Sequence, residues 1–212
     1  MCDRVLGALA LYLAQPIRRS GEAVTGNEQW LAAILNPGDV LLSDGNTRVA
    51  ALVKRVTRST WSHVSMYVGP LEPGPDPRCI VEAHIVDGVR AIRLSELGAL
   101  QVRVLRPIGL SAEHRRQLAD WVVSRIGSEY DLAHAWFLGR RLLRLPLRPR
   151  SRTSGSTTRF ICSSLLAHAF ALVGRPIEPD APRAGRTCAS DHRNLTPADF
   201  ERAPTFEMVG WN

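Results

Sequence analysis

Hydrophobic and polar residues alternate along two segments in the middle of the chain, which predicts two half-buried β-strands. In residues 62–69 the more polar side carries His63, Ser65 and Tyr67, and the apolar side carries Val64, Met66 and Val68. In residues 80–86 the polar positions are Glu82 and His84, which alternate with Val81, Ala83 and Ile85. Residues 70–77 are rich in proline and glycine and predict a loop between the two strands.

Further apolar runs predict strands at residues 40–42, 89–94 and 101–105. Asp87 and Gly88 form a dipeptide that is typical of a two-residue hairpin turn, so residues 89–94 should return antiparallel to residues 80–86. The middle of the chain therefore predicts a mostly antiparallel sheet.

Helical spacing of apolar residues occurs before and after these strands. Helices are predicted at residues 47–57, 111–126, 131–138 and 160–173. Ser111 is a suitable N-cap for the second of them, and Gly127 a suitable stop. Residues after 176 are rich in proline and predict irregular chain with one closing strand. Together the pattern predicts an α+β fold.

The N-terminus admits two interpretations. Residues 5–14 form an apolar run of the length of a signal peptide, but Asp3 offsets the charge of Arg4 in front of it. Val5, Leu6, Leu9 and Leu13 follow helical spacing, which favours an amphipathic helix. We therefore expect an N-terminal helical segment at residues 1–35 and a domain at 36–212, with a cleaved signal as the alternative.

Composition narrows the class of protein. The chain has 212 residues, 45% of them hydrophobic, which suits one compact core beyond the N-terminal segment. Its four cysteines contain no Cys-x-x-Cys pair, so a zinc ribbon or a disulfide framework is not expected. The net charge is +7, with Lys54 the single lysine, but no zinc-finger or RNA-binding signature accompanies it. Nucleic acid is therefore not an expected partner.

One basic segment stands apart from the rest. Residues 140–152 contain six arginines and no acid, interspersed with leucines. Such a segment predicts contact with an anionic membrane surface. A solvated loop without a partner is the alternative. We expect a cytoplasmic protein that can associate peripherally with membranes; a secreted or periplasmic location stays open.

Cys162 and His63 are the first candidates for chemistry. Cys162 lies two residues into the predicted helix 160–173, where unpaired N–H groups favour an anion, and the thiolate is the nucleophilic form of cysteine. His63 can accept a thiol proton near neutral pH. An unpaired cysteine that only fills space and a solvated strand histidine are the competing interpretations.

The strand at residues 80–86 offers an orienting group for His63. If the two strands pair, Glu82 can lie beside His63 and stabilise its protonated ring. His84 competes for this role. A zinc site built from His63, His84 and Cys162 matches no usual spacing, so no metal is expected.

Six segments also resemble one known family in their order along the chain. They are residues 37–42 (PGDVLL), 61–69 (WSHVSMYVG), 81–83 (VEA), 127–131 (GSEYD), 160–165 (FICSSL) and 195–200 (LTPADF). These segments resemble the permuted papain-like cysteine hydrolases of the NlpC type, in the YiiX-like or YebB-like branch. The resemblance implies a papain-like fold in circularly permuted order, with a central antiparallel sheet or barrel packed against helices.

The resemblance also implies roles for individual residues. Cys162 would be the nucleophile, His63 the general base and Glu82 the orienting third residue. Tyr67, Tyr130, Ser65 and Ser163, which lie in or next to these segments, are the expected substrate-binding residues. The basic segment 140–152 departs from the family pattern and leaves the substrate open.

The expected activity is hydrolysis of an amide or ester bond through a thioester on Cys162, without a cofactor. A lipid acyl hydrolase or acyltransferase, similar to the lecithin:retinol acyltransferase branch, is one alternative. A lipid-binding module of the same fold without catalysis is the other.

Overall fold

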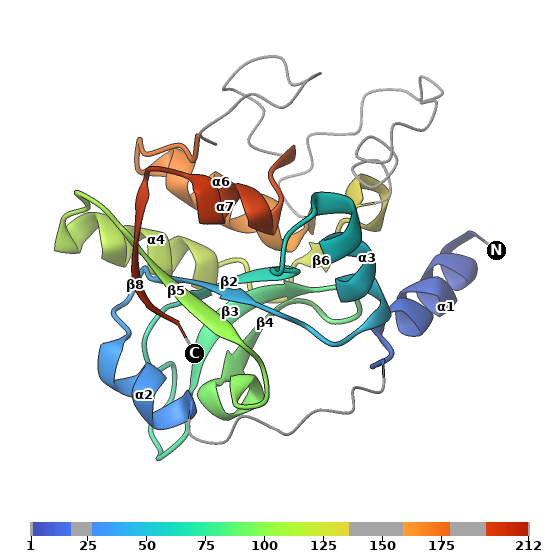
Figure 1. The fold of residues 1–212 in the computed structure, drawn as a ribbon, viewed down its shortest axis with the longest axis horizontal. Coiled ribbons are helices and arrows are strands. Elements are labelled where there is room, and N and C mark those ends of the chain that lie inside the picture. Colours follow the sequence, from blue (N-terminus) through green and yellow to red (C-terminus); the bar gives the residue numbers. More distant parts are fainter. Residues whose placement is uncertain (1, 18–26, 136–158, 179–193, 212) are drawn as a thin grey trace.

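A computed structural model describes residues 2–17, 27–135, 159–178 and 194–211. Its centre is a six-stranded antiparallel sheet with the order β4-β3-β2-β1-β5-β8 (Figure 1). The strands are β1 (Val40–Ser43), β2 (His63–Tyr67), β3 (Arg78–His84), β4 (Gly88–Arg93), β5 (Val102–Pro107) and β8 (Phe206–Trp211). The strands predicted in the middle of the chain are thus confirmed, within a few residues at their ends.

Helices cover both faces of this sheet. They are α1 (Cys2–Ala14), α2 (Asn27–Ile34), α3 (Arg48–Thr57), α4 (Ala112–Val123), α6 (Cys162–Leu172) and α7 (Pro197–Arg202). In Figure 1, α6 and α7 lie above the sheet and α2 lies below it. The architecture is the predicted α+β fold with an antiparallel sheet packed against helices.

The strand alternation separates two clusters of buried side chains. Val64 and Met66 of β2 belong to a larger cluster that includes Leu118 of α4 and Phe170 of α6. Leu41, Ile80 and Val104 point to the other face, where they pack with Leu31 of α2 and with the short 3₁₀ helix η1 (Leu94–Leu97). Of the β2 side chains at odd positions, Tyr67 packs against this second cluster, whereas His63 at the start of the strand lines the pocket described below.

The hairpin between β3 and β4 differs in one detail from the prediction. His84 pairs with Gly88, so the turn contains the three residues 85–87 instead of two. Gly88 has φ of 72°, and a Cβ on it would lie 2.2 Å from the carbonyl oxygen of Ser128. Both the backbone conformation and the close approach of Ser128 explain why glycine occupies this position.

Three elements near the end of the chain were not predicted. Helix α7 begins after Thr196, whose backbone N–H and side-chain hydroxyl both donate to the Asp199 carboxylate at 2.8 Å. Two short strands, β6 (Glu129–Tyr130) and β7 (Arg159–Phe160), pair in parallel. This pairing places Tyr130 beside Phe160, two residues before Cys162.

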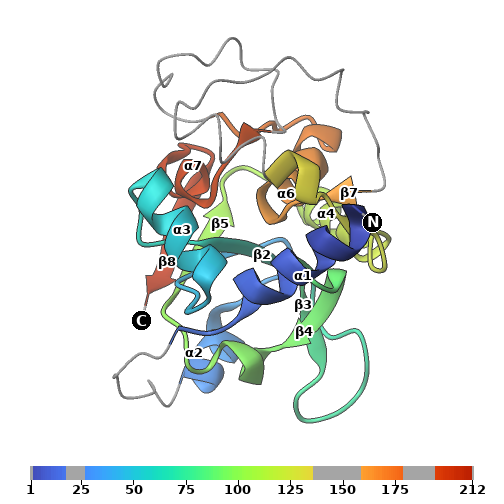
Figure 2. The ribbon, with the colours of Figure 1, turned by 90° about the vertical axis from the view of Figure 1, so that its right-hand side faces the viewer.

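The N-terminal segment 1–35, in which helical spacing is expected, contains α1, and this helix packs along α3 (Figure 2). Pro16 forms a β-bridge with Thr47, and the N–H of Ile17 donates to the Asn46 carbonyl at 2.7 Å. The division of the chain at residue 35 stays a prediction. None of the described helices combines the length and the hydropathy needed to cross a bilayer.

The basic segment 140–152 lies outside the described residues, as does the end of the helix predicted at 131–138. Residues 132–135 of that helix are described and helical, and the N–H of His134 donates to Oδ1 of Asp131 at 2.9 Å.

Candidate active site

Cys162 is the first residue of α6, so the helix begins two residues later than predicted. Ile161 is the N-cap in an extended conformation, with φ of −98° and ψ of 163°. Ser164 closes the turn, because its hydroxyl accepts the N–H of Ile161 at 3.0 Å and lies 3.1 Å from its carbonyl oxygen. Cys162 is half-buried, and N–H groups in the first turn have no acceptor within the helix. A negative charge on the sulfur or on a bound substrate is favoured there.

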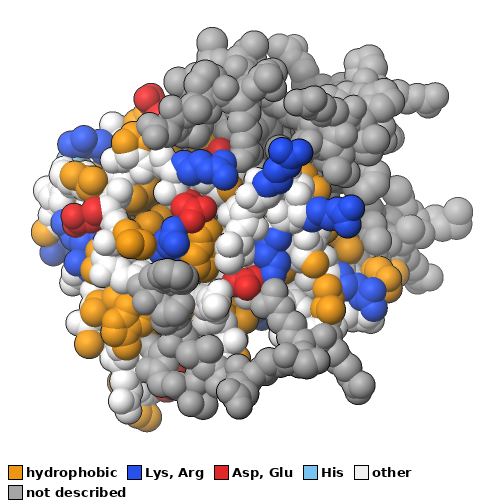
Figure 3. All heavy atoms as spheres, in the orientation of Figure 1, with side chains coloured by type: hydrophobic (Ala, Val, Ile, Leu, Met, Phe, Trp, Pro, Cys, Tyr) orange, Lys and Arg blue, Asp and Glu red, His pale blue; other side chains and the backbone are white. Residues whose placement is uncertain are grey.

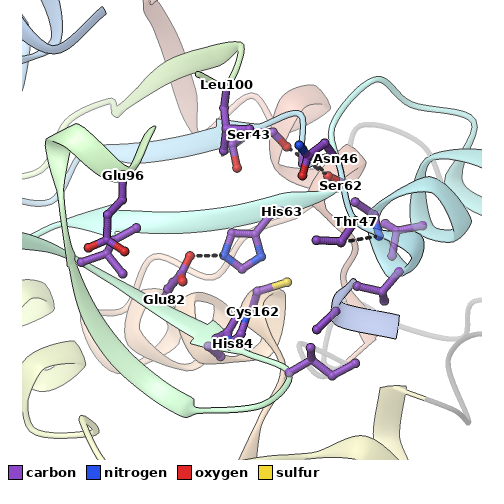
Figure 4. A pocket seen from close by; sticks show the side chains of 18 of the residues that line it. Ser43, Asn46, Thr47, Ser62, His63, Glu82, His84, Glu96, Leu100 and Cys162 are labelled. Carbon is purple, nitrogen blue, oxygen red and sulfur yellow. Dashed lines mark hydrogen bonds and ion pairs between the residues drawn. The ribbon is translucent and has the colours of Figure 1, made fainter. Parts of the chain in front are cut away.

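His63 is the first residue of β2 and lies between Cys162 and Glu82 (Figure 4). Its Nε2 is 2.8 Å from Oε2 of Glu82. Because Nε2 is engaged in this way, Nδ1 is the ring nitrogen left to contact the thiol of Cys162. The structure thus brings together the three residues that the sequence predicted as a group.

The protonation of His63 depends on these two neighbours. Burial by itself lowers the pKa of His63, but the charge of Glu82, the charge of a Cys162 thiolate and hydrogen bonds to both raise it to about 10. The raised pKa keeps the His63 ring protonated at neutral pH.

Glu82 is a buried carboxylate that is satisfied on both oxygens. Its second oxygen, Oε1, accepts from Nε of Arg90 at 2.9 Å and lies 2.8 Å from Nη2 of the same side chain. Burial alone would raise the pKa of Glu82, yet the charges of His63 and Arg90 and their hydrogen bonds lower it to about 2. Glu82 is thus an anion throughout the neutral range.

Arg90 was not among the predicted site residues. Glu82 and Arg90 face each other across the β3–β4 hairpin, so the signal that could have found Arg90 was the hairpin register. The two-residue turn predicted from the sequence gives a different register, in which Glu82 and Arg90 do not face each other.

His84 does not share Glu82 with His63. Its Nδ1 lies 2.8 Å from Oδ2 of Asp87, which also accepts from Nη1 of Arg90 at 2.8 Å. Burial and the charge of Arg90 lower the pKa of His84. A chain of charged contacts therefore runs from Cys162 through His63, Glu82 and Arg90 to Asp87.

Of these side chains, Cys162, His63, Glu82, His84 and Arg90 line a pocket of about 240 Å³. Its polar wall comprises Ser43, Asn46, Thr47, Ser62, His63, Glu82, His84, Arg90, Glu96, Tyr130 and Cys162. Its apolar wall comprises Ala14, Val49, Ala50, Val53, Ala83, Ile85, Ile92, Leu97 and Leu100. A reacting group can reach the sulfur from this pocket while an apolar part of the same molecule contacts α3 or η1.

Of the predicted substrate-binding residues, Tyr130 lines the pocket. Burial, the charge of Cys162 and that of Asp131 raise the pKa of its phenol, so the hydroxyl keeps its proton and can donate a hydrogen bond. Ser65 is fully buried, and Tyr67 packs against the second core cluster. The hydroxyl of Ser163 is also buried and donates to the Leu195 carbonyl at 2.5 Å. These three residues lie outside the pocket lining.

No group of three or more His, Cys, Asp or Glu side chains within the described ranges is arranged to hold a metal ion. Both oxygens of Glu82 are already used by His63 and Arg90. The zinc arrangement of His63, His84 and Cys162 that was weighed from the sequence is therefore not assembled in these residues.

Comparison with known proteins places the chain in a family. Residues 34–140, half of the chain, match the model of the permuted papain-like amidase enzymes of the YaeF/YiiX type, the C92 family. The matched region includes His63 and Glu82 and ends before Cys162. The comparison with curated proteins finds no match.

Among solved structures, the chain is similar to the crystal structure of the metalloprotein YiiX from Escherichia coli O157:H7. The TM-score is 0.57 at 19% sequence identity, and the alignment covers 84% of this chain and 97% of YiiX. At this identity the likeness shows a shared fold. The sheet with its histidine strand ahead of the cysteine helix, and the family match over that sheet, agree: the chain belongs to the permuted papain-like amidases of the YaeF/YiiX type and is a thiol hydrolase.

Proposed function

We propose that this protein hydrolyses an amide bond through a covalent thioester on Cys162. The observation that carries the proposal is the order of groups at the pocket: a half-buried thiol at a helix start, then His63, then Glu82 held by Arg90. A nucleophile, a base and an orienting group in mutual contact are the parts that acyl transfer requires.

The reaction begins with the thiolate of Cys162, whose proton resides on His63. The sulfur attacks the carbonyl carbon, and the carbonyl oxygen becomes an oxyanion. N–H groups at the start of α6 and the hydroxyl of Tyr130 are positioned to donate to it. The C–N bond then breaks while the His63 imidazolium gives its proton to the leaving nitrogen, and a thioester remains.

Hydrolysis of the thioester uses the same histidine in the opposite direction. Neutral His63 takes a proton from water, and the resulting hydroxide attacks the thioester carbon. The C–S bond breaks, the carboxylic acid leaves, and the thiolate and imidazolium are restored. Glu82 fixes the ring through Nε2 in both steps and stabilises its charge.

A lipid acyl hydrolase or acyltransferase is the second candidate, because part of the pocket is apolar. Val49 and Val53 of α3 and Leu97 and Leu100 near η1 offer aliphatic contacts on either side of the polar groups. Contact of residues 140–152 with an anionic membrane would bring such a substrate to the site. A lipid-binding module without catalysis would leave the Cys162, His63 and Glu82 arrangement without a use.

YiiX is described as a metalloprotein. In the described residues of this chain, His63 and Arg90 engage both oxygens of Glu82, and no group of three or more His, Cys, Asp or Glu side chains is arranged to hold a metal ion. No step of the proposed reaction passes through a metal.

Intact-mass analysis tests the proposal. The protein is incubated with peptides, N-acyl amides and acyl esters, and the mass gained by Cys162 identifies the acyl group. An adduct from amides favours the amidase; an adduct from acyl esters alone favours the lipid enzyme.

The rate at which a thiol probe labels Cys162 tests the alternative that the protein is a lipid-binding module without catalysis. Cys162 should react with iodoacetamide faster than glutathione does if it is a catalytic thiol. If it reacts no faster, and if no substrate class gives an adduct, the catalytic proposal is refuted.

A further inference from the structure

Helices α1 and α3 pack side by side at the edge of the pocket (Figures 1 and 2). Large hydrophobic side chains of these helices, and Ile17 just after α1, are exposed. The exposed fractions are 59% for Leu11, 50% for Tyr12, 42% for Ile17 and 47% for Leu52. Exposed hydrophobic side chains that gather in one place mark an interaction surface more often than scattered ones do.

Tyr12 of this group contacts an arginine of α3. Nη1 of Arg48 donates to the Tyr12 hydroxyl at 2.9 Å, and its guanidinium lies 4.4 Å from the Tyr12 ring centroid. Leu52 and Arg55 follow Arg48 by four and seven residues, so all three share one side of α3. We call Leu11, Tyr12, Ile17, Arg48, Leu52 and Arg55 the α1–α3 face.

The charge of this face is of one sign. The sequence of α3 contains no acidic residue, and Arg48, Arg55 and the neighbouring Arg58 are exposed. None of the three forms an ion pair with a residue in the described part of the chain. Lys54, by contrast, is paired with Asp44. In Figure 3, basic and hydrophobic side chains lie next to one another over the region that α1 and α3 form in Figure 1.

The α1–α3 face and the pocket share one helix. Val49, Ala50 and Val53 of α3 line the pocket together with Ala14 at the end of α1. The adjoining side of α3 carries Arg48 and Leu52. Any surface that the α1–α3 face contacts is therefore separated from the pocket by the width of one helix.

We propose that the α1–α3 face docks on the surface of an anionic lipid bilayer, with α3 between the bilayer and the pocket. The arginines match lipid phosphates, and the leucines and Tyr12 match the boundary between headgroups and acyl chains. An acidic protein would match the arginines but would not account for four exposed hydrophobic side chains beside them. The docking does not depend on catalysis, and it involves residues distinct from the basic segment 140–152.

Cosedimentation with vesicles tests the docking. The protein starts with Arg140, Arg141, Arg144 and Arg148 replaced by glutamine, so that the basic segment does not mask the α1–α3 face. We expect this protein to bind vesicles of phosphatidylglycerol and phosphatidylcholine, to bind pure phosphatidylcholine weakly, and to lose binding as salt rises, since charges are screened over ~8 Å at physiological salt.

Two variants of the α1–α3 face should weaken binding in that background. Arg48→Gln with Arg55→Gln should lower the partition coefficient by about 25-fold, at about fivefold for each arginine. Leu11→Ser with Leu52→Ser should lower it at least about tenfold. The control is Leu172→Ser with Met208→Ser, two residues that are 64% and 61% exposed elsewhere on the molecule; it should bind unchanged.

Thermal unfolding followed by circular dichroism shows that each variant is folded. Absence of binding to anionic vesicles at low salt by the starting protein would overturn the docking, and so would equal binding by the control and by folded α1–α3 variants. Cys162→Ala should bind vesicles normally, so failure of the catalytic proposal and failure of the docking are separate results.

Discussion

Two histidine–carboxylate pairs lie at or beside the pocket and share the same contact distance; of their four side chains, Asp87 is not part of the pocket lining. His63 and Glu82 are 2.8 Å apart, and so are His84 and Asp87. Their protonation differs in direction: the pKa of His63 is raised to about 10, whereas that of His84 is lowered. A short contact to a carboxylate therefore does not by itself determine the direction in which the pKa of a histidine shifts.

The difference comes from the other neighbours of each pair. The charge of Cys162 also raises the pKa of His63, and the Glu82 carboxylate is buried. Burial, and then the charge of Arg90, lower the pKa of His84. The side chain of its partner Asp87 is 47% exposed, where solvent screens the attraction. Arg90 contacts both carboxylates and therefore lies between the two pairs.

The largest effect should follow from removing the sulfur. Cys162→Ala should reduce turnover by a factor on the order of 10³ or more, because it removes the nucleophile and one of the two anions beside His63. Steady-state kinetics on the substrate identified by mass analysis measures it. Cys79→Ala is the control, since Cys79 is buried outside the pocket and should retain near-normal turnover. Near-normal turnover by Cys162→Ala would refute the assignment.

The two carboxylates should differ strongly when each is neutralised. Glu82→Gln should lower kcat by on the order of 10²-fold or more, since the amide keeps the shape but not the charge that stabilises the imidazolium. Asp87→Asn and His84→Gln should change kcat by no more than a few fold. Equal large losses in all three variants would mean that both pairs act in catalysis.

The pH dependence of ring protonation should differ between His63 and His84. In an NMR titration of the imidazole protons, His63 should remain protonated until the pH approaches about 10, whereas His84 should lose its proton below its ordinary pKa of 6.5. Glu82→Gln should lower the pKa of His63. Titration of both rings near 6.5 would contradict the contrast.

The free energy of unfolding should depend on pH because the pKa of His63 is raised in the folded state. The folded-state pKa of His63 exceeds its unfolded value, so its contribution to the free energy of unfolding is complete below about pH 6.5 and disappears as the pH rises through 10. The stability difference between the native protein and His63→Gln, followed by urea unfolding, should therefore shrink over that range.

The smallest effect should come from Arg90, which acts through Glu82. Arg90→Gln should raise the pKa of Glu82, because Arg90 helps to lower it, and should reduce kcat about tenfold, as for loss of a group that holds a ligating or orienting side chain. Arg90→Lys should recover part of the pKa change but less of kcat, since one ammonium cannot place two N–H groups on one oxygen.

Arg78→Gln is the matched control for Arg90. Arg78 lies on the same strand as Glu82 but pairs with Glu72 at the surface, outside the pocket lining. It should change kcat by less than about twofold, as is usual for an exposed pair. An equal loss in Arg78→Gln and Arg90→Gln would assign the effect of Arg90 to general destabilisation.

Local sequence determined the elements whose pattern is repeated over many residues. The alternation in residues 62–69 and 80–86 predicted β2 and β3, Ser111 predicted the start of α4, and the apolar spacing after Cys162 predicted α6. These signals are visible because side-chain periodicity is a property of a single segment. Short elements such as α2 and α7 carry too few repeats for this.

The pairing within the site was decided by the tertiary structure. From the sequence, Glu82 and His84 are both candidates to orient His63. The pairing of β2 with β3 brings Glu82 to His63. The three-residue turn at 85–87 sets the β3–β4 register, which brings Arg90 to Glu82 and leaves His84 in contact with Asp87. The parallel pairing of β6 with β7 likewise brings Tyr130 toward Cys162. Such contacts depend on how distant segments are aligned, which no single segment encodes.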